Sequence, residues 1–495
     1  MTIDELVFAS ELPSATIARR LSHGGLRRLA TGVYTTDTTS PPDAVVRRHA
    51  LAIAGQLYPR AVVTDRSARS GGPVDGRLYL AHDRRPRVTE LPGLTITTRR
   101  GAGPLAGDVA LPGGLHVAST GRALAENVRP SRQRAGNQPR TMTLVELEAW
   151  IDRLCRVDGE AKLAGYREQA ERVASVVGTT AADLAVLVRA IGVALGSRQA
   201  PVAARALAAR QAGRPYDEER VDRFDRLVRA LREAAPQSRP VDRNDPERYR
   251  VLPFFEAYFS NYIEGTEFAL AEAEALVYDD VQPVNRPADA HDLVGTFAIV
   301  ADDTEMSRRF DTVDEFVDAM RARHSIVMAG RPERRPGALK DLANQAGRSV
   351  FVAPDLVQGT LVEAFARLPD LDTPWERAVY TMFFVAEIHP FDDGNGRIAR
   401  IMMNGELVAN AETRIIIPTV FRSDYLGALR RLTRDDDPSV FVKAMRYAHD
   451  WTFGIEFESV ESATTQLAVT NAFEEDDSGR RLLLPQRSRD VIASL

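Results

Sequence analysis

The stretch EIHPFDDGNGRIAR, residues 387–400, brings a histidine, acidic residues, a glycine-rich turn and two arginines close together. The segments on either side, residues 373–387 and 401–410, both carry apolar residues at helical spacing. Proline cannot continue a helix, so we predict a helix that ends before Pro390 and a second helix that begins near Gly396. The pattern therefore predicts a helix–loop–helix unit in a mainly α-helical fold.

The predicted loop has the residue types that a phosphate site requires. Backbone N–H groups at a glycine-rich helix start bind anions, and phosphate above all. Arg397 and Arg400 are three positions apart, so they share a helix face and can both grip a polyphosphate. Asp393 suits a divalent cation that bridges phosphates, and His389 suits a general base near neutral pH. The set predicts attack of a hydroxyl group on a nucleotide phosphate.

Residues 389–400, HPFDDGNGRIAR, match the signature HxFx(D/E)GNGRxxR at every defined position. The region therefore resembles the Fic (Fido) family, which transfers AMP, or occasionally another phosphate-containing group, from a nucleotide to a protein hydroxyl. The resemblance implies an all-helical Fic core with a β-hairpin flap. It also implies ATP and Mg²⁺ as cofactors and a target protein with a Ser, Thr or Tyr hydroxyl. We therefore expect a protein adenylyltransferase.

The resemblance assigns roles along the signature. His389 would be the catalytic base that deprotonates the target hydroxyl, and Asp393 would hold Mg²⁺. Gly396, where the death-on-curing kinase branch has a lysine, favours nucleotidyl over phosphoryl transfer. The nucleotide phosphates would be bound by the residues that follow the metal ligand, namely Gly394, Asn395, Gly396, Arg397 and Arg400.

Residues 260–265, SNYIEG, resemble the inhibitory motif (S/T)xxxE(G/N) of the family, in the class whose inhibitory helix precedes the core. Ser260 and Glu264 are four positions apart and share a helix face, and Gly265 completes the motif. By the resemblance, Glu264 would reach Arg400 and take the guanidinium group that should hold the γ-phosphate. The alternative is a de-AMPylating enzyme, in which Glu264 orients a water molecule.

Two further segments resemble parts of the family. Residues 335–354 resemble the segment that leads into the flap, and RSVFVAP (348–354) would hold the target as an added strand through main-chain hydrogen bonds. Residues 422–429, RSDYLGAL, resemble the segment that closes over the adenine, which nominates Tyr425 as a nucleotide-binding residue. Leu426 stands where relatives often have a second aromatic residue.

The net charge of −5 is unevenly distributed. Residues 1–140 hold 20 basic and 11 acidic residues, a balance of +9, which leaves −14 for the rest of the chain. The segment SATIARRLSHGGLRRLATGVYTT (14–36) reads as a helix with Arg19 and Arg20, followed by a hairpin with Arg27 and Arg28. This order resembles a winged helix-turn-helix, whose helix enters the major groove while the wing contacts phosphates. The alternative is a solvated basic face on a protein-binding domain.

Residues 1 to about 235 also resemble the AbiEi-type antitoxin and transcriptional-regulator family. The likeness rests on the segments 26–36, 57–72 and 140–154. The chain departs from the family at Asp65–Arg66–Ser67–Ala68, where a histidine or a serine-rich segment is usual. The resemblance keeps a second hypothesis open, that the chain is a DNA-binding regulator with a Fic unit as its sensor.

The chain is long enough for several domains. We expect a winged-helix-like domain (1–50), an α+β AbiEi-like domain (51–130) and a helical middle region (131–235). A Fic domain would follow (236–460, with an inhibitory helix near 255–270), and then a weakly ordered tail (461–495). A single cysteine, Cys155, excludes an internal disulfide framework. With neither a signal pattern nor a long apolar run, we expect a cytoplasmic protein; the sequence leaves open whether it forms a homodimer.

Overall fold

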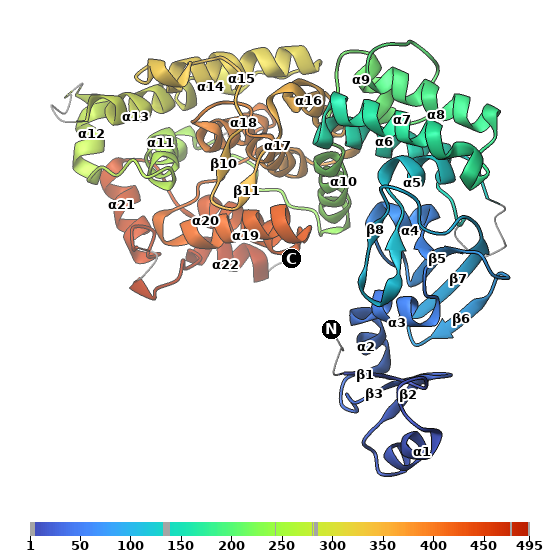
Figure 1. Ribbon diagram of the computed structural model, residues 1–495. Coiled ribbons are helices and arrows are strands. Elements are labelled where there is room, and N and C mark those ends of the chain that lie inside the picture. The colour runs from blue at the N-terminus through green and yellow to red at the C-terminus, as the bar shows by residue number, and fades with distance from the viewer. Residues whose placement is uncertain are drawn as a thin grey trace. The chain divides into compact units, whose positions relative to one another are not determined.

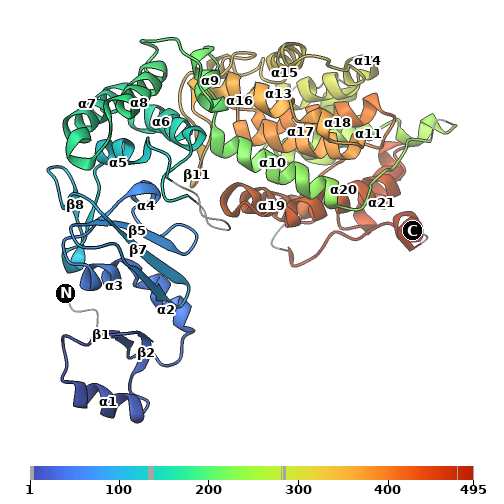
Figure 2. The same cartoon turned by 90° about the vertical axis from the view of Figure 1, so that its right-hand side faces the viewer.

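The computed structural model describes residues 5–131, 139–242, 244–279, 281, 286–475 and 478–493. The chain divides into two compact units, Met1–Gly213 and Arg214–Leu495 (Figures 1 and 2). The first unit contains both larger sheets, and the second is helical except for one short hairpin. The fold is therefore mainly α with an α+β N-terminal part, which confirms the predicted fold class.

Unit 1 begins with a three-stranded antiparallel sheet in the order β1-β3-β2. The elements are β1 (Leu6–Phe8), α1 (Ser14–Ser22), β2 (Arg27–Ala30) and β3 (Val33–Thr35). A helix-turn-helix would begin with a further helix before α1, but the segment in that place, β1, is a strand. Its three apolar residues are all buried, and they pair with β3 across the small sheet instead of forming a helix.

A six-stranded mixed sheet follows, in the order β6-β7-β5-β4-β9-β8. Its strands are β4 (Val62–Val63), β5 (Arg77–His82), β6 (Val88–Leu91), β7 (Leu94–Arg100), β8 (Val109–Ala110) and β9 (His116–Val117). The helices of this part are α2 (Pro42–Arg48), α3 (Ala50–Leu57), α4 (Asp65–Ser70) and α5 (Thr120–Asn127). Fully buried aliphatic side chains from the sheet and from α2 and α3 form one core, among them Val45, Ile53, Val63, Leu78 and Ile96.

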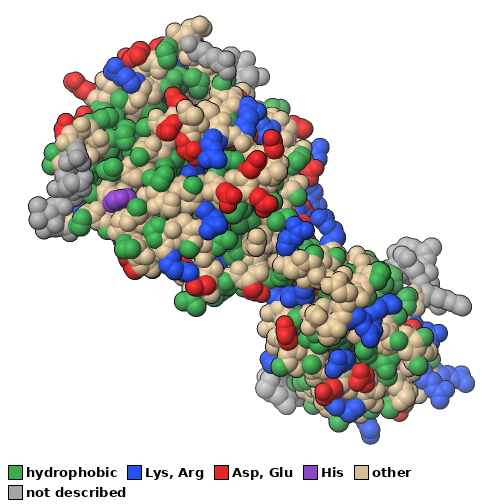
Figure 3. Space-filling model, turned by 90° about the horizontal axis from the view of Figure 1, so that it is seen from above, with side chains coloured by type: hydrophobic (Ala, Val, Ile, Leu, Met, Phe, Trp, Pro, Cys, Tyr) green, Lys and Arg blue, Asp and Glu red, His purple; other side chains and the backbone are tan. Residues whose placement is uncertain are grey.

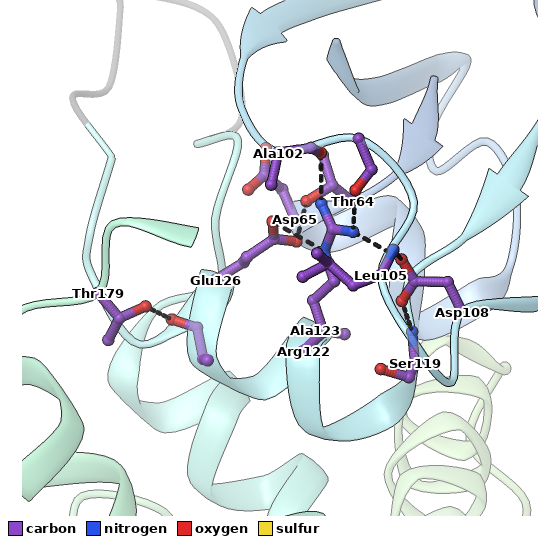
Figure 4. Close-up of polar contacts among 12 residues, drawn as sticks. Thr64, Asp65, Ala102, Leu105, Asp108, Ser119, Arg122, Ala123, Glu126 and Thr179 are labelled. Carbon is purple, nitrogen blue, oxygen red and sulfur yellow. Dashed lines mark hydrogen bonds and ion pairs between the residues drawn. The ribbon is translucent and has the colours of Figure 1, made fainter. Parts of the chain in front are cut away.

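A buried ionic network joins this sheet to α5 (Figure 4). Asp65 accepts hydrogen bonds from Arg99 (3.0 Å) and Arg140 (2.6 Å). Arg122, which is fully buried, pairs with Asp108 (2.6 Å) and Glu126 (3.2 Å). Each carboxylate has a guanidinium partner, as buried charges require. The departure from the AbiEi pattern at Asp65 is therefore part of an internally paired network.

The remainder of unit 1 is helical, with α6 (Leu144–Asp158), α7 (Glu160–Val177), α8 (Ala181–Ala194) and α9 (Arg205–Gln211). Helix α6 starts with a capping box between Thr143 and Glu146. Cys155 lies on the buried face of this helix, and within the described ranges it is a free thiol.

Unit 2 is built around two adjacent helices, α17 (Pro374–Ile388) and α18 (Asn395–Ala409), which lie side by side in Figures 1 and 2. The helices before them are α10 (Glu218–Glu233), α11 (Leu252–Ile263), α12 (Leu270–Tyr278), α13 (Pro287–Val300), α14 (Asp303–Met306), α15 (Val313–Val327) and α16 (Val357–Phe365). Those after them are α19 (Arg422–Asp435), α20 (Ser439–Gly454), α21 (Val460–Val469) and α22 (Gln486–Ala493). Strands β10 (Gln345–Ala346) and β11 (Ser349–Val350) form the predicted flap hairpin.

One domain boundary and the order of the C-terminal tail differ from those expected from the sequence. Helix α10, which we had grouped with the middle region, belongs to unit 2, because its buried Phe224 packs against aromatic rings of α17. The tail 461–495, expected to be weakly ordered, contains α21 and α22. Ala463 and Leu467 of α21 are fully buried, and α22 packs against α20.

The visible surface carries basic and acidic side chains interspersed with apolar ones (Figure 3). Among the described helices, none is long and apolar enough to span a bilayer. The described residues also contain no group of three or more His, Cys, Asp or Glu side chains arranged to hold a metal ion.

Candidate active site

The loop between α17 and α18 has the geometry that its sequence predicts. Helix α17 ends at Ile388, and His389 caps it in the left-handed region (φ 55°). Helix α18 begins at Asn395 after Gly394 (φ 71°). The Asn395 side chain accepts a hydrogen bond from the backbone N–H of Phe391 and donates one to its carbonyl, both at 2.9 Å. The predicted helix ends are thus confirmed, and Asn395 holds the loop closed.

A cavity of about 560 Å³ opens at this loop. It is lined by segments that are far apart in the sequence: the C-terminal cap of α11, the flap, the end of α17, the start of α18 and one face of α19. Five of the predicted site residues line it, namely Glu264, His389, Gly396, Arg400 and Tyr425. The lining does not include Asp393, Gly394, Asn395 or Arg397.

The inhibitory-motif residues surround Arg400, which is 4% exposed. Its Nη2 lies 2.8 Å from Oε1 of Glu264, the residue that caps α11. Its Nε donates to Oγ of Ser260 (3.0 Å), and Nη2 also donates to the Ser260 carbonyl (2.8 Å). Burial has the largest effect and disfavours the charged guanidinium, but Glu264 and Tyr425 together outweigh it and raise the pKa of Arg400. Gly265 follows with φ 86°, a conformation that glycine adopts without strain.

The Glu264 carboxylate also lies over the first turn of α18. A Cβ atom at position 396 would lie 2.1 Å from Oε1 of Glu264, so any larger residue here would displace this carboxylate. A helix N-terminus attracts anions through its free N–H groups and its dipole. Glu264 therefore lies where an anionic ligand at this helix start would bind.

His389 is held with one ring nitrogen on a protein acceptor. Its Nδ1 lies 3.2 Å from the carbonyl oxygen of Ala386. A carbonyl can only accept, so Nδ1 carries the proton and Nε2 is left as the basic nitrogen. Burial, followed by the nearby Lys340 cation, lowers the pKa of His389 to about 4. The ring is therefore neutral at pH 7 and able to accept a proton.

Arg397 is engaged with a different carboxylate. Its Nη1 lies 2.5 Å from Oδ2 of Asp292, and the side chain is buried. Asp292 also accepts from Nε of Arg331 (2.8 Å). The two signature arginines thus have different partners, and of the two only Arg400 lines the cavity.

Asp393 places a single carboxylate in the loop between α17 and α18. One oxygen accepts the backbone N–H of Gly394 (2.7 Å), and the other lies 3.7 Å from Nε of Arg334. The Asp393 carbonyl is bound by the ring of His324, which stacks on Phe391 (centroids 3.8 Å apart, planes 5° apart). One carboxylate combined with phosphate oxygens is a donor set that Mg²⁺ accepts, because this ion keeps few protein ligands.

Tyr425 of α19 lines the cavity, although little of its surface is exposed. It is 1% exposed, its hydroxyl interacts with Arg400, and it lies 3.3 Å from Sδ of Met382. The neighbouring residues of α19 that line the cavity are Leu426, Leu429, Arg430, Thr433 and Arg434.

Comparison with known families and proteins agrees with this geometry. Residues 314–407 match the model of the Fic/DOC family. The chain contains a Fic domain. The matched range includes the flap, α17, most of α18 and the whole signature loop of the Fic domain.

Curated relatives of the Fic domain include protein adenylyltransferases. The chain is 25% identical over 187 residues to protein adenylyltransferase fic-1 of Caenorhabditis elegans, which covers 36% of each chain. It is 26% identical over 249 residues to protein adenylyltransferase Fic of Nematostella vectensis, covering 48% of this chain and 56% of the relative. The chain thus spans between about a third and just over half of these relatives. A solved structure of C. elegans Fic-1 aligns over 62% of this chain and 86% of its own, with 16% identity and a TM-score of 0.36.

Several residues that shape the Fic site were missed by the sequence reasoning. Asp292 binds Arg397, His324 holds the Asp393 carbonyl, and Phe351 stacks on His389. Phe351 falls within the predicted flap, so the family pattern placed its segment but not its contact. Asp292 and His324 lie on ordinary amphipathic helices, and no local pattern distinguishes them.

Two buried histidines of unit 2 predict a loss of stability in acid. His324 and His449 are fully buried, and burial lowers their pKa to about 4 and about 3. In the unfolded chain both histidines take up a proton near pH 6.5, whereas in the folded protein they stay neutral to a lower pH. The free energy of unfolding is therefore fully present above pH 6.5 and falls as the pH drops toward the folded pKa values. At pH 5 each histidine should cost about 2 kcal/mol of unfolding free energy. Urea unfolding at pH 7.5 and pH 5 measures the difference.

His449→Gln is the matched variant for this measurement. Glutamine can still donate to the Thr413 carbonyl, which His449 Nε2 contacts at 2.9 Å, but it does not titrate. The variant should lose about 2 kcal/mol less than the wild type between the two pH values. Equal losses in both proteins would show that His449 does not resist protonation in the folded state.

Proposed function

We propose that the chain is a protein adenylyltransferase that transfers AMP from ATP to a hydroxyl side chain of a target protein and is held inactive by Glu264. The observation that carries the proposal is the Glu264–Arg400 pair at the start of α18, in the same cavity as the neutral His389. A carboxylate bound at an anion site, beside a poised base, is the arrangement expected of an autoinhibited phosphate-transfer enzyme.

The transfer needs few protein groups. Nε2 of His389 accepts the proton of the target hydroxyl while the hydroxyl oxygen forms a bond to the α-phosphorus of ATP. The bond between the α-phosphorus and the bridging oxygen breaks, and pyrophosphate leaves with the electron pair. The N–H groups at the start of α18 and the Arg400 guanidinium stabilise the phosphate charge. Arg400 is free to do so only after Glu264 has moved away.

Magnesium fits this proposal through Asp393, whose carboxylate would hold the ion together with phosphate oxygens. When bound, the ion neutralises phosphate charge and orients the leaving pyrophosphate. Gly394 and Gly396 would let the backbone approach the nucleotide. Arg397 would reach a phosphate only by changing its pairing with Asp292, so we assign the γ-phosphate contact to Arg400 first.

Mass spectrometry of the intact protein after incubation with ATP and magnesium tests the proposal. The Glu264→Gly variant is the sample of choice because its anion site is free. We expect a mass increase equal to one AMP group, on the protein itself or on a protein of a cell lysate. ATP with a non-hydrolysable α–β linkage is the control. Absence of any AMP adduct from the Glu264→Gly variant under these conditions would refute the transferase activity.

DNA binding by unit 1 is a second candidate function, independent of the Fic site. Helix α1 carries Arg19 and Arg20 in its last turn and is mostly exposed. Of the wing arginines, Arg28 is exposed on β2, whereas Arg27 donates to the carbonyls of Asp37 and Ser40. The basic surface that supports this candidate is therefore Arg19, Arg20 and Arg28.

We expect the chain to bind duplex DNA, including the DNA upstream of its own gene, with an affinity that falls steeply with salt. Replacing both Arg19 and Arg20 by serine should weaken binding and reduce the slope of log K against log salt by about 2, because each phosphate contact releases counterions. Fluorescence anisotropy at several salt concentrations measures this slope. Arg172, an exposed arginine of α7, provides the matched control as Arg172→Ser. Absence of binding at low salt would remove this candidate.

A further inference from the structure

The orientation of the His389 ring is not explained by its own hydrogen bond. The residue lies in the left-handed region, which is uncommon for a side chain other than glycine. Its ring makes one hydrogen bond, from Nδ1 at 3.2 Å. A single contact at this distance restrains rotation of the ring only weakly. A base must stay within hydrogen-bonding reach of its substrate to act. Another group must therefore hold the plane of the ring.

Phe351 is that group. Its ring lies parallel to the imidazole of His389, with centroids 3.7 Å apart and planes 4° apart. Phe351 directly follows β11 of the flap and lines the cavity with His389. Face-to-face contact with a neutral ring allows movement within the plane but opposes rotation out of it.

The base of the flap is fastened to the loop around His389. The backbone N–H of Phe351 donates to the Asn344 carbonyl (3.2 Å), which continues the pairing of the hairpin. The Asn344 side-chain amide donates to the carbonyl of Phe391 (2.9 Å). Lys340 donates through its backbone N–H to the carbonyl of Pro390 (2.9 Å) and through its ammonium group to that of Ile388 (3.3 Å). These acceptors lie on both sides of His389 in the chain.

The outer edge of the flap is fixed as well. Asn344 and Phe351 form a hydrogen-bonded pair across the hairpin. The backbone groups of the next residue along the strand, Val350, therefore point away from the hairpin. Arg220 of α10 donates to the Val350 carbonyl and also to Glu387 in the last turn of α17. The flap strand that carries Phe351 is thus tied to the same helix end as His389.

We propose that Phe351 is a positioning residue, which holds the His389 imidazole with Nδ1 on the Ala386 carbonyl and Nε2 toward the cavity. The flap thereby couples target docking to base orientation, since an added target strand would contact the same hairpin that carries Phe351. This inference rests on the proposed function of the Fic domain. It assigns to one flap side chain an effect on the chemical step.

Phe351→Leu and Phe351→Tyr, both made in a Glu264→Gly background, test the inference. Leucine keeps an apolar side chain but removes the flat ring, whereas tyrosine keeps the ring. We expect Phe351→Leu to lower kcat for AMP transfer by about 10- to 100-fold with little change in the KM for ATP, as misplaced reacting groups do. Phe351→Tyr should retain most of the rate. Equal rates in the leucine variant and the parent would overturn the proposal.

Nitrogen-15 NMR of histidine-labelled protein provides a readout that does not depend on turnover. In the parent protein the His389 signals should report a neutral ring with its proton on Nδ1. The leucine variant should show exchange between both tautomers, whereas Leu342→Ala, at a residue just before the flap that is 74% exposed, should leave the signals unchanged. A fixed Nδ1 tautomer in Phe351→Leu would overturn the positioning role even if kcat fell. If no variant transferred AMP, the proposed function would fail, and the NMR result would still decide the role of Phe351.

Discussion

Replacing His389 by alanine should abolish AMP transfer while leaving the fold and nucleotide binding largely intact. Loss of a general base typically costs about 100- to 10,000-fold in rate, and no second histidine lines the cavity among the described residues. The phosphate contacts come from Arg400 and the start of α18, so ATP affinity should change little. Transfer of labelled AMP in the Glu264→Gly background measures the rate, and calorimetry measures ATP binding.

His291→Ala is the matched control, because this histidine is exposed on α13 and does not line the cavity. It should transfer AMP at the parent rate. Parent-like transfer by His389→Ala would instead mean that another group, or solvent, removes the hydroxyl proton, and the assignment of the base would be withdrawn.

Replacing Glu264 by glycine should raise AMP transfer by about 10- to 100-fold. The Glu264–Arg400 contact is a charge-assisted hydrogen bond of 2.8 Å, and such bonds contribute about 1.5–3 kcal/mol. The substitution also clears the first turn of α18, because the Glu264 carboxylate lies against Gly396. Glu264 caps α11 at its exposed end, so the fold should be unharmed. Initial rates of auto-AMPylation, compared at equal protein concentration, give the factor.

Arg400→Ala separates the inhibitory contact from the phosphate contact. It removes the partner of Glu264 but also the ligand of the γ-phosphate, so it should not reproduce the gain. The Glu264→Gly, Arg400→Ala double variant should resemble Arg400→Ala alone. This non-additivity is the expected sign that the two side chains act through one contact.

Unchanged or slower transfer by Glu264→Gly would contradict inhibition. Glu264 would then be either an ordinary helix-end residue or the group that orients water for AMP removal. Incubating a pre-modified target with each protein distinguishes these, because only a water-positioning Glu264 would make AMP removal depend on this side chain.

The local sequence determined the central features of the Fic site. Pro390 and the glycine-rich turn set the ends of α17 and α18, because these residues restrict or free the backbone wherever they occur. The spacing of Ser260 and Glu264 put both on one side of α11, and their pairing with Arg400 follows from charge and from the family pattern. Such features depend on neighbours in the chain, so a pattern of residues suffices to predict them.

Contacts between distant segments were decided by the tertiary structure. The burial of Arg397 against Asp292, the contact of Tyr425 with Met382 and the stacking of Phe351 on His389 each join helices or loops whose packing no local pattern fixes. The strand β1 is a further case, since a short apolar segment takes the structure of whatever surface buries it. The membership of α10 in unit 2 was also decided by packing, because its Phe224 contacts aromatic rings of α17. The sequence alone thus nominated candidate chemical groups for the site, and the packing of the helices and the flap determined which of them meet in the cavity.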